Sequence, residues 1–449
     1  MDNKKVFEEY PVGKSLRLMA GPAIIGQLVT LIYNMADTFF IGQVNNPYMI
    51  AAASLVLPLF MICTPLAIVS GTGGGSLISR LLGLKKTEEA KRISTFAILA
   101  STVFGLVYGI LIAVFKDNLL WLLGASVNNI EYAREYTTYV LCIGSLPTIL
   151  SITFSSLLRS TGHSKEAGLG MTLGGVLNII LDPLFMFVIL PDGKEVIGAG
   201  VATMVSNVLS CIYYVIVIAR IKENKIIYLT FKNGFPEKEN IIKLFSVGLP
   251  AATTTILFDL NNIILNKLMS GYGDHALAAS GIVLKVERLS LNTNVGLCMG
   301  MAPIVAYNYS AKNYDRMKET IKLTRRTGII ISLIALVFYE FCSATIMEVF
   351  IKDPQTVMYG TAFLKLRAFA AMLMFCNIYI ANIFQGVGFG KTTFGLAFMR
   401  YALINIPVLF ILNHFFGCYG IMAGQFVGDI FSSIIATIVL TRFLRHCYN

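Results

Sequence analysis

The chain has 449 residues, of which 56% are hydrophobic and only 14% are charged, against about 25% charged residues in an average soluble domain. This composition argues against a soluble fold and predicts a protein that lies mainly within a membrane. The net charge of +11 would suit a nucleic-acid partner only if membrane topology left the basic residues unexplained.

Apolar runs long enough to cross a bilayer, about 20 residues each, recur along the whole chain. They lack the alternating polarity of β-barrel strands, so the predicted fold class is an all-α integral membrane protein. The twelve predicted spans lie approximately at 15–43, 49–82, 92–115, 131–157, 166–190, 198–220, 241–270, 276–306, 321–343, 356–384, 393–414 and 418–441.

The basic residues fall mainly on one side of this predicted topology. The N-terminus, the even-numbered loops and the C-terminus hold 27 of the 36 Lys and Arg residues, and the odd-numbered loops hold seven. Lys285 and Arg288 lie within the eighth span. Since cytoplasmic loops carry an excess of basic residues, both termini are predicted to be cytoplasmic, and no nucleic-acid partner is expected.

The second half of the chain repeats the first. Pro22 and Asn34 are matched 228 residues later by Pro250 and Asn262, and 162–165 resembles 388–391 at an offset of 226. Two six-helix repeats with pseudo-two-fold symmetry are typical of carriers that work by alternating access. We therefore expect an N-terminal lobe at 1–220, a cytoplasmic linker at 221–240 and a C-terminal lobe at 241–449.

The sequence shows no catalytic or cofactor motif. The eight cysteines are scattered singly, the four histidines fall in predicted loops or tails, and no phosphate-binding loop of the Gly-x-x-x-x-Gly-Lys-Ser/Thr type occurs. The predicted linker is also too short for a nucleotide-binding domain. We expect a secondary transporter with no cofactor, neither an enzyme nor an ATP-driven pump.

Two acidic residues at membrane depth are the strongest functional candidates. A carboxylate there is costly and commonly faces a cavity or a partner. Tyr33 and Asp37 share one helix face, and so do Asn178 and Asp182, because each pair is four residues apart. Such a set can hold one proton or one Na⁺. The alternatives are a capped structural carboxylate at Asp37 and a helix end at the Asp182-Pro183 pair.

Four further acids lie in predicted spans. Glu287 stands between Lys285 and Arg288, where an ion-paired cluster and a substrate contact are equally compatible with the sequence. Glu340 and Asp429 lie nearer the ends of their spans and are expected to be structural or solvated. Asp259 lies two residues before the pair Asn261-Asn262, and the sequence leaves open which face of the helix it occupies.

Together these residues resemble the multidrug and toxic compound extrusion (MATE) family, most closely the bacterial branch represented by MepA and DinF. The resemblance covers nearly the whole chain. It rests on Pro22, Tyr33 and Asp37 in the first span and on the repeat offset. It also rests on the segments Asn178-Ile179-Ile180-Leu181-Asp182-Pro183, Gly198-Ala199-Gly200-Val201-Ala202-Thr203 and Pro303-Ile304-Val305-Ala306-Tyr307-Asn308-Tyr309.

The resemblance implies roles for particular residues. The cation-coupling set, which would also ligate Na⁺ if Na⁺ is the coupling ion, consists of Asp37, Asn178, Asp182 and Thr203. The resemblance also gives Tyr33 and Ser155 neighbouring positions in the cavity lining. Independently of the resemblance, we expect the substrate cavity to be lined as well by Asn34, Asn262, Glu287 and Arg288. Pro22 matches the proline at which the first helix bends. This chain has Asp259, Asn261 and Asn262 where other members carry a seventh-span Glu, which puts a second, C-terminal cation site in doubt.

Comparison of the two repeats indicates which half carries the acidic residues. Asp37 aligns with Leu265, Thr203 aligns with Gln425, and Asp182 aligns with Ile406. Residues needed only for the scaffold should occur in both copies, so an acidic pair confined to one copy indicates a coupling site in the N-terminal lobe.

The predicted function is an efflux antiporter that exports amphipathic organic cations or other small-molecule drugs in exchange for H⁺ or Na⁺. The alternative is a lipid-linked oligosaccharide flippase of the same superfamily, although twelve spans and only two basic residues at depth argue against it. The expected protein is monomeric, contacts membrane lipids, and spans the bacterial cytoplasmic membrane.

Overall fold

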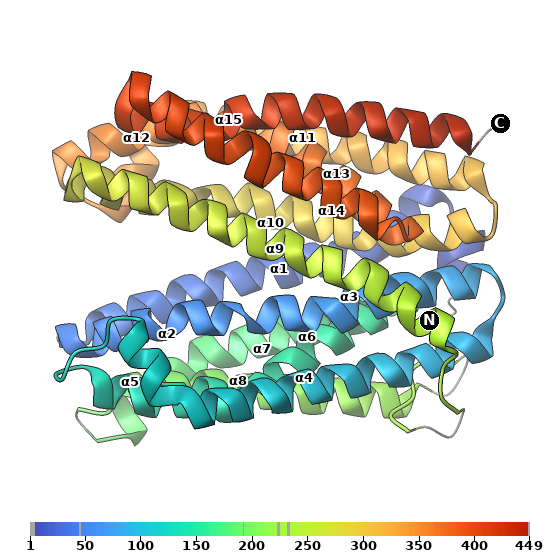
Figure 1. The fold of residues 1–449 in the computed structure, drawn as a ribbon, viewed down its shortest axis with the longest axis horizontal. Helices are drawn as coiled ribbons and strands as arrows, with labels where there is room; N and C mark the ends of the chain where they lie inside the picture. Colours follow the sequence, from blue (N-terminus) through green and yellow to red (C-terminus); the bar gives the residue numbers. More distant parts are fainter. Residues whose placement is uncertain (1–4, 45, 192, 222–224, 231–233, 448–449) are drawn as a thin grey trace.

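The structure is a computed structural model that describes residues 5–447 except 45, 192, 222–224 and 231–233. The described chain is almost entirely helical and forms two stacked groups of helices (Figure 1). Helices α1–α8 form the lower, blue-to-green N-lobe, and α9–α15 form the upper, yellow-to-red C-lobe. Both ends of the chain lie at the same end of the bundle.

The helices of the N-lobe follow one another with short connections. They are α1 (Val12–Gln43), α2 (Pro47–Met61), α3 (Cys63–Gly83), α4 (Thr87–Leu122), α5 (Ile130–Thr137), α6 (Ser145–Ser160), α7 (Ser164–Leu184) and α8 (Glu195–Arg220). Three π-helical segments accompany them, at Lys5–Glu9, Thr138–Ile143 and Phe185–Ile189.

The C-lobe repeats this pattern. Its helices are α9 (Lys238–Met269), α10 (Asp274–Ser310), α11 (Tyr314–Phe350), α12 (Pro354–Ala368), α13 (Ala370–Val387), α14 (Gly390–Phe398) and α15 (Ile406–His446). A 3₁₀ turn, Ser270–Tyr272, follows α9, and a π-helical segment, Met399–Asn405, joins α14 to α15.

The membrane crossings agree with the twelve-span prediction. In the described residues, ten helices are long and apolar enough to cross a membrane, or eleven when the bent pair Ile130–Ile143 and Ser145–Ser160 counts as one span. The helical stretch Gly390–His446 turns back at Gly417, where φ is 58° and ψ is −140°, and so crosses twice. The predicted all-α, multi-pass membrane fold is confirmed.

The repeat is visible in the backbone as well as in the sequence. Lys85 and Lys312 both follow a long helix and have φ values of 59° and 58°, which non-glycine residues rarely adopt. Gly162 and Gly388 occupy another pair of matching turns, with φ values of 84° and 94°. Residues related by an offset of 226 or 227 therefore adopt the same unusual turn conformation.

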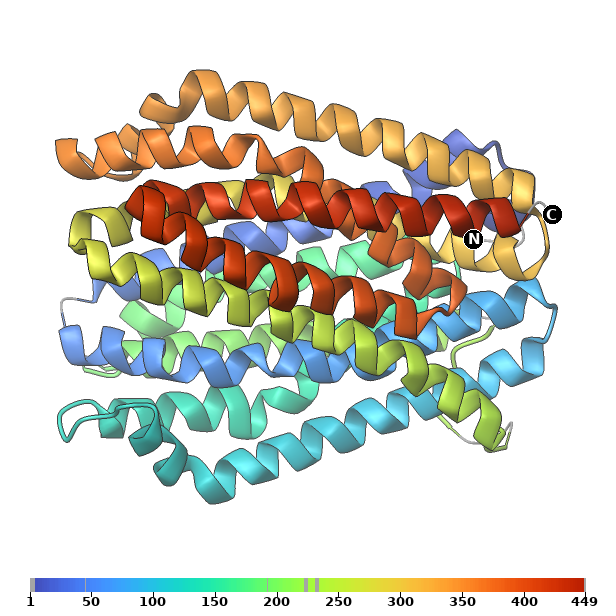
Figure 2. The same cartoon turned by 45° about the horizontal axis from the view of Figure 1, so that its top comes forward.

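The lobes meet through glycine-rich helix contacts. A Cβ atom on Gly300 of α10 would overlap the backbone of Ala20 in α1, and one on Gly296 would lie 2.6 Å from the Cα of Ile24. On the other pair of helices, a Cβ on Gly73 of α3 would lie 2.5 Å from the carbonyl oxygen of Leu244 in α9. All these contacts involve the halves of the helices nearest the chain ends, and Figure 2 shows both ends on that side of the bundle.

The segment between the lobes is attached to the N-lobe. Within the predicted linker, residues 222–224 and 231–233 lie outside the described residues, and α9 already begins at Lys238. Ile226 and Ile227 are buried, and Ser94 of α4 donates a hydrogen bond to the carbonyl of Ile226 at 2.8 Å. The lobe boundaries proposed from the sequence stay a prediction.

The lobe contact makes a testable stability prediction. A Cβ on Gly248 of α9 would overlap the carbonyl of Val69 in α3, so Gly248→Ala should cost about 1–3 kcal/mol through overpacking and lower the thermal unfolding midpoint. Gly281→Ala in α10 is the matched control, because its Cβ would meet no atom within 4 Å. Equal midpoints for both variants, measured by size-exclusion after heating, would contradict the tight contact.

Candidate functional site

Close packing of α1 on α7 brings the two predicted acidic helices together. Gly175 of α7 makes this approach possible, because a Cβ there would lie 2.6 Å from Val29 Cγ1 and 3.2 Å from Tyr33 Cδ1. Asp37 therefore comes from the second half of α1, and Asn178 and Asp182 come from the facing end of α7. The structure places both predicted i, i+4 pairs at one helix–helix contact.

A hydrogen-bond network joins three of the four predicted coupling residues. Asn178 Nδ2 donates to Asp182 Oδ1 at 3.1 Å and to Thr203 Oγ1 of α8 at 3.3 Å. Asp182 and Asn178 are almost completely buried, at 0% and 3% exposed. Asp37 is half-buried and joins the group electrostatically, since its charge and that of Asp182 interact and both act on Tyr33.

The site contains several buried oxygen atoms without hydrogen bonds. Within the described residues these atoms include Asp37 Oδ1, Asn178 Oδ1 and Asp182 Oδ2. Ser155 of α6, which was expected to line the substrate cavity, interacts instead with Tyr214 of α8. Native proteins pair nearly all buried polar atoms, so such a concentration calls for an additional partner. Carboxylate, amide and hydroxyl oxygens suit a hard monovalent cation, and the two carboxylates also suit a proton.

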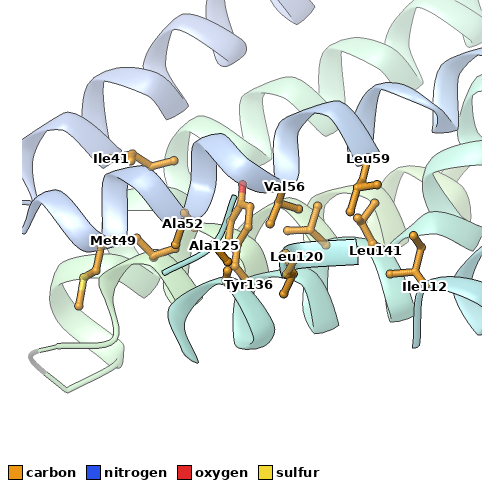
Figure 3. Close-up of a cluster of buried hydrophobic side chains, with 14 of the residues drawn as sticks. Ile41, Met49, Ala52, Val56, Leu59, Ile112, Leu120, Ala125, Tyr136 and Leu141 are labelled. Carbon is orange, nitrogen blue, oxygen red and sulfur yellow. The ribbon is translucent and has the colours of Figure 1, made fainter. Parts of the chain in front are cut away.

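An apolar cluster lies next to the site. Ile41 of α1 and Met49 and Val56 of α2 face Ala125, Tyr136 and Leu141 in Figure 3. Tyr136 is buried within this cluster and interacts electrostatically with both Asp37 and Asp182. The cluster packs α2 against α5 next to the acidic pair.

Pro183 shows why the Asp182 segment has an irregular backbone. Proline has no N–H group for the carbonyl of Ile179, and α7 ends one residue later and continues as the π-helical segment Phe185–Ile189. The helix-ending role considered from the sequence is therefore present. It coexists with the network of Asp182, which stays inside the helix.

The remaining predicted lining residues are more dispersed. Asn34 is exposed on α1, and its Nδ2 donates back to the carbonyl of Thr30 at 2.7 Å. Asn262 is half-buried on α9, and Arg288 is exposed on α10, where it interacts with Asp259. Pro22 lies inside an unbroken α1, so bending there stays a prediction.

Glu287 does not form a local cluster with its basic neighbours. It is 6% exposed, and its Oε2 accepts hydrogen bonds from Arg367 Nε at 2.9 Å and Nη2 at 2.6 Å. The ion-paired cluster with Lys285 and Arg288 considered from the sequence is therefore wrong, because helical geometry turns both basic side chains away from Glu287. Glu287 also borders a small cavity with Ser290 and Asn294, inside the C-lobe.

Sequence reasoning missed a second buried ion pair. Arg400 Nε and Nη2 donate to Asp429 Oδ1 at 2.7 Å and Oδ2 at 2.9 Å, and Gln425 Nε2 donates to Asp429 Oδ2 at 2.7 Å. Asp429 is 0% exposed, so it is structural and not solvated. The only available signal was a basic residue at Arg400 inside a predicted span. Unlike the N-lobe acids, Asp429 already has a cation within the protein.

Comparisons with known proteins agree with this architecture. The MatE family model matches residues 22–184 and 250–411, two segments that begin 228 residues apart. Two multidrug export proteins MepA are each 30% identical to this chain, one from Staphylococcus haemolyticus (strain JCSC1435) over 437 residues and one from Staphylococcus aureus (strain NCTC 8325 / PS 47) over 440 residues. Both alignments cover 97% of this chain and 94% of the relative.

Solved structures show the same fold. An outward-facing structure of a multidrug resistance MATE family transporter superposes with a TM-score of 0.94, and a MATE structure in complex with MaL6 superposes with 0.93. Each is 22% identical and covers 100% of this chain and 99% of its own. The fold and these matches define a membrane transporter and not an enzyme. The chain belongs to the MatE family, the multidrug and toxic compound extrusion transporters, as the resemblance predicted.

Proposed function

We propose that this protein is a multidrug efflux antiporter that exports amphipathic organic cations in exchange for H⁺ or Na⁺ across the bacterial cytoplasmic membrane. The observation that carries the proposal is the concentration of unpaired, buried oxygen atoms on Asp37, Asn178 and Asp182. The names of the staphylococcal relatives, which match nearly the whole chain, support drug export.

The coupling ion would bind between α1, α7 and α8. The unpaired oxygens of Asp182 and Asn178, the Thr203 hydroxyl and Asp37 form a donor set suited to Na⁺. A proton would instead bind to one of the two carboxylates. Two interacting carboxylates in a buried site repel each other, so binding of one positive charge relieves the repulsion.

The contrast between the lobes supports a single coupling site in the N-lobe. Asp182 has no basic partner among its hydrogen bonds, whereas Asp429 in the C-lobe is held by Arg400. An acid neutralised by a fixed arginine gains little from an external cation. Asp37 and Asp182 therefore gain more from an arriving ion than Asp429 does.

Neutralising Asp37 would couple ion binding to movement of α1. The charged carboxylate favours a hydrated position, and the neutral or ion-bound form removes that preference. Pro22 provides the flexible point, because it cannot donate a hydrogen bond to the carbonyl of Leu18. Movement of the second half of α1 would then reduce the space available to the drug beside the N-lobe and release the drug.

The positions of the lobe contacts, combined with the predicted topology, support a direction for this step. With both termini in the cytoplasm, as the distribution of basic residues predicts, the lobes touch on the cytoplasmic side. The state described by the structure is then the one open to the outside, from which drug leaves and the ion enters.

The driving force is sufficient for drug export. A 1:1 exchange of H⁺ or Na⁺ for a singly charged drug moves no net charge, so the concentration gradient of the ion drives it. A gradient equivalent to 100 mV contributes about 2.3 kcal/mol per ion and supports roughly a fifty-fold drug gradient. The 30 Phe, 20 Tyr and 18 Met residues offer adaptable apolar walls and cation–π faces for such substrates.

The coupling ion is tested by applying one gradient at a time. Purified protein in liposomes receives a pH gradient in one experiment and a Na⁺ gradient in another, and one of the two should move a cationic dye against its own gradient. An ion gradient equivalent to 100 mV should give up to about fifty-fold dye accumulation. The ion that drives transport identifies the coupling. Dye movement that neither gradient accelerates would contradict antiport, while leaving membership of the family intact.

A further inference from the structure

The turn that precedes α1 occupies a built site between the two lobes. Lys5–Glu9 forms one π-helical turn, and the side chains of Val6 and Phe7 within it are 0% exposed. Phe7 stacks on Tyr307 of α10, with ring centroids 5.0 Å apart and an interplanar angle of 18°. Val6, Phe7 and Tyr307 form one apolar cluster with Met19 of α1, and Leu82 of α3 packs against it.

C-lobe side chains hold the backbone of this turn. Arg316 of α11 donates from Nε to the carbonyl of Phe7 and from Nη2 to the carbonyl of Tyr10, both at 2.7 Å. Nη2 also lies 3.1 Å from Ser15 Oγ and 3.4 Å from the carbonyl of Val6. The Arg316 guanidinium thus donates from both Nε and Nη2. These hydrogen bonds are charge-assisted and therefore stronger than neutral ones.

Two neighbouring side chains of α10 also form hydrogen bonds with this turn. Tyr307 donates from its hydroxyl to Glu8 Oε1 at 2.5 Å, and Asn308 Nδ2 donates to the carbonyl of Phe7 at 3.3 Å. On the other side, Ser15 Oγ of α1 donates to the carbonyl of Val6 at 2.7 Å. The turn is thus continuous with the N-lobe and bound to the C-lobe.

From this geometry we infer that Lys5–Glu9 is a latch that holds the two lobes together at the end of the bundle where the chain termini lie. The latch lies beside the closest lobe contacts, where Gly83 of α3 meets the carbonyl of Tyr307 and Gly300 of α10 meets Ala20. Opening this end separates α1 from α10. The turn must then either leave Tyr307 and Arg316 or lose its attachment to α1.

This inference rests on the alternating-access function proposed above and assigns a controlling element to it. Release of the latch exposes two apolar side chains and leaves the Arg316 guanidinium without its carbonyl partners. Both changes disfavour the state open at this end. The latch therefore sets the balance between the two states without touching the ion site between α1 and α7.

Hydrogen–deuterium exchange on the full-length protein in lipid nanodiscs, without drug or ion gradient, tests the latch. Arg316→Ala and Phe7→Ala should each raise exchange in residues 19–24 of α1 and 296–311 of α10. We expect an increase of about tenfold or more for Arg316→Ala. Lys322→Ala, which removes an exposed cation from the same helix, is the matched control and should leave exchange in both segments at the wild-type level.

Exchange in α5, which lies at the opposite end of the bundle from the chain termini (Figure 1), reports whether each variant is folded. If the variants raise exchange only in residues 5–11 and leave both lobe-contact segments unchanged, the turn is a passive terminus and the inference is wrong. That failure differs from a failure of ion coupling, because this measurement needs no transport and Asp37 is unaltered in it.

Discussion

Replacing Asp37 or Asp182 by Asn should abolish uphill drug export while leaving the protein folded. Asn has the same shape, but it can neither take up a proton nor neutralise a bound cation. Loss of ion coupling removes the roughly fifty-fold dye gradient that an ion concentration gradient equivalent to 100 mV sustains, so the dye distribution should fall close to equilibrium. Dye efflux from drug-sensitive cells or from proteoliposomes measures the effect, and thermal unfolding shows that folding is retained.

Glu340→Gln provides the matched control for these acids. Glu340 also lies at membrane depth, but it belongs to α11 of the C-lobe, where its neighbour is Lys365 at 3.9 Å. Export by Glu340→Gln should stay near the wild-type level. Full export by both Asp37→Asn and Asp182→Asn would end the proposal of an N-lobe coupling site, and severe loss in Glu340→Gln would show that the acids have been ranked wrongly.

Asp429→Asn should destabilise the C-lobe strongly. The substitution leaves the Arg400 guanidinium, which is 5% exposed, buried without a counter-charge. Breaking one side of a buried ion pair costs about 3–5 kcal/mol. Thermal unfolding followed by size-exclusion chromatography should show a much lower midpoint and reduced yield.

Two controls separate charge burial from loss of a contact. The double variant Arg400→Met with Asp429→Leu removes both charges and should recover most of the stability, because a buried pair can often be replaced by apolar residues. Asp117→Asn breaks the exposed pair with Arg134 and should cost at most about 1 kcal/mol. An Asp429→Asn variant as stable as Asp117→Asn would rule out the buried pair as a structural element.

The apolar runs were enough to predict most of the fold. Twelve spans followed from their length alone, since a helix must satisfy its own backbone hydrogen bonds within lipid. Matching turns at Lys85 and Lys312 then showed the repeat in three dimensions. The spacing of Asn178 and Asp182 placed both on one helix face, and the structure shows the hydrogen bond that this spacing permits.

The partners of buried charges could not be predicted in the same way. Glu287 pairs with Arg367, 80 residues away, although two basic residues stand within two positions of it in the sequence. Arg400 pairs with Asp429 across the turn at Gly417. The apolar pattern predicts that turn but not which side chains meet across it. In both cases the choice depends on which faces of two helices meet.

The sequence by itself determined the membrane fold, the duplication and the candidate acids of the N-lobe, because each follows from local composition or helical periodicity. Only the tertiary structure decided that the first turn lies between the lobes, that Arg400 neutralises Asp429, and that the oxygens around Asp182 stay unpaired. These features depend on packing between helices distant in the chain. Many partners are compatible with one amphipathic face, and only the assembled bundle selects among them.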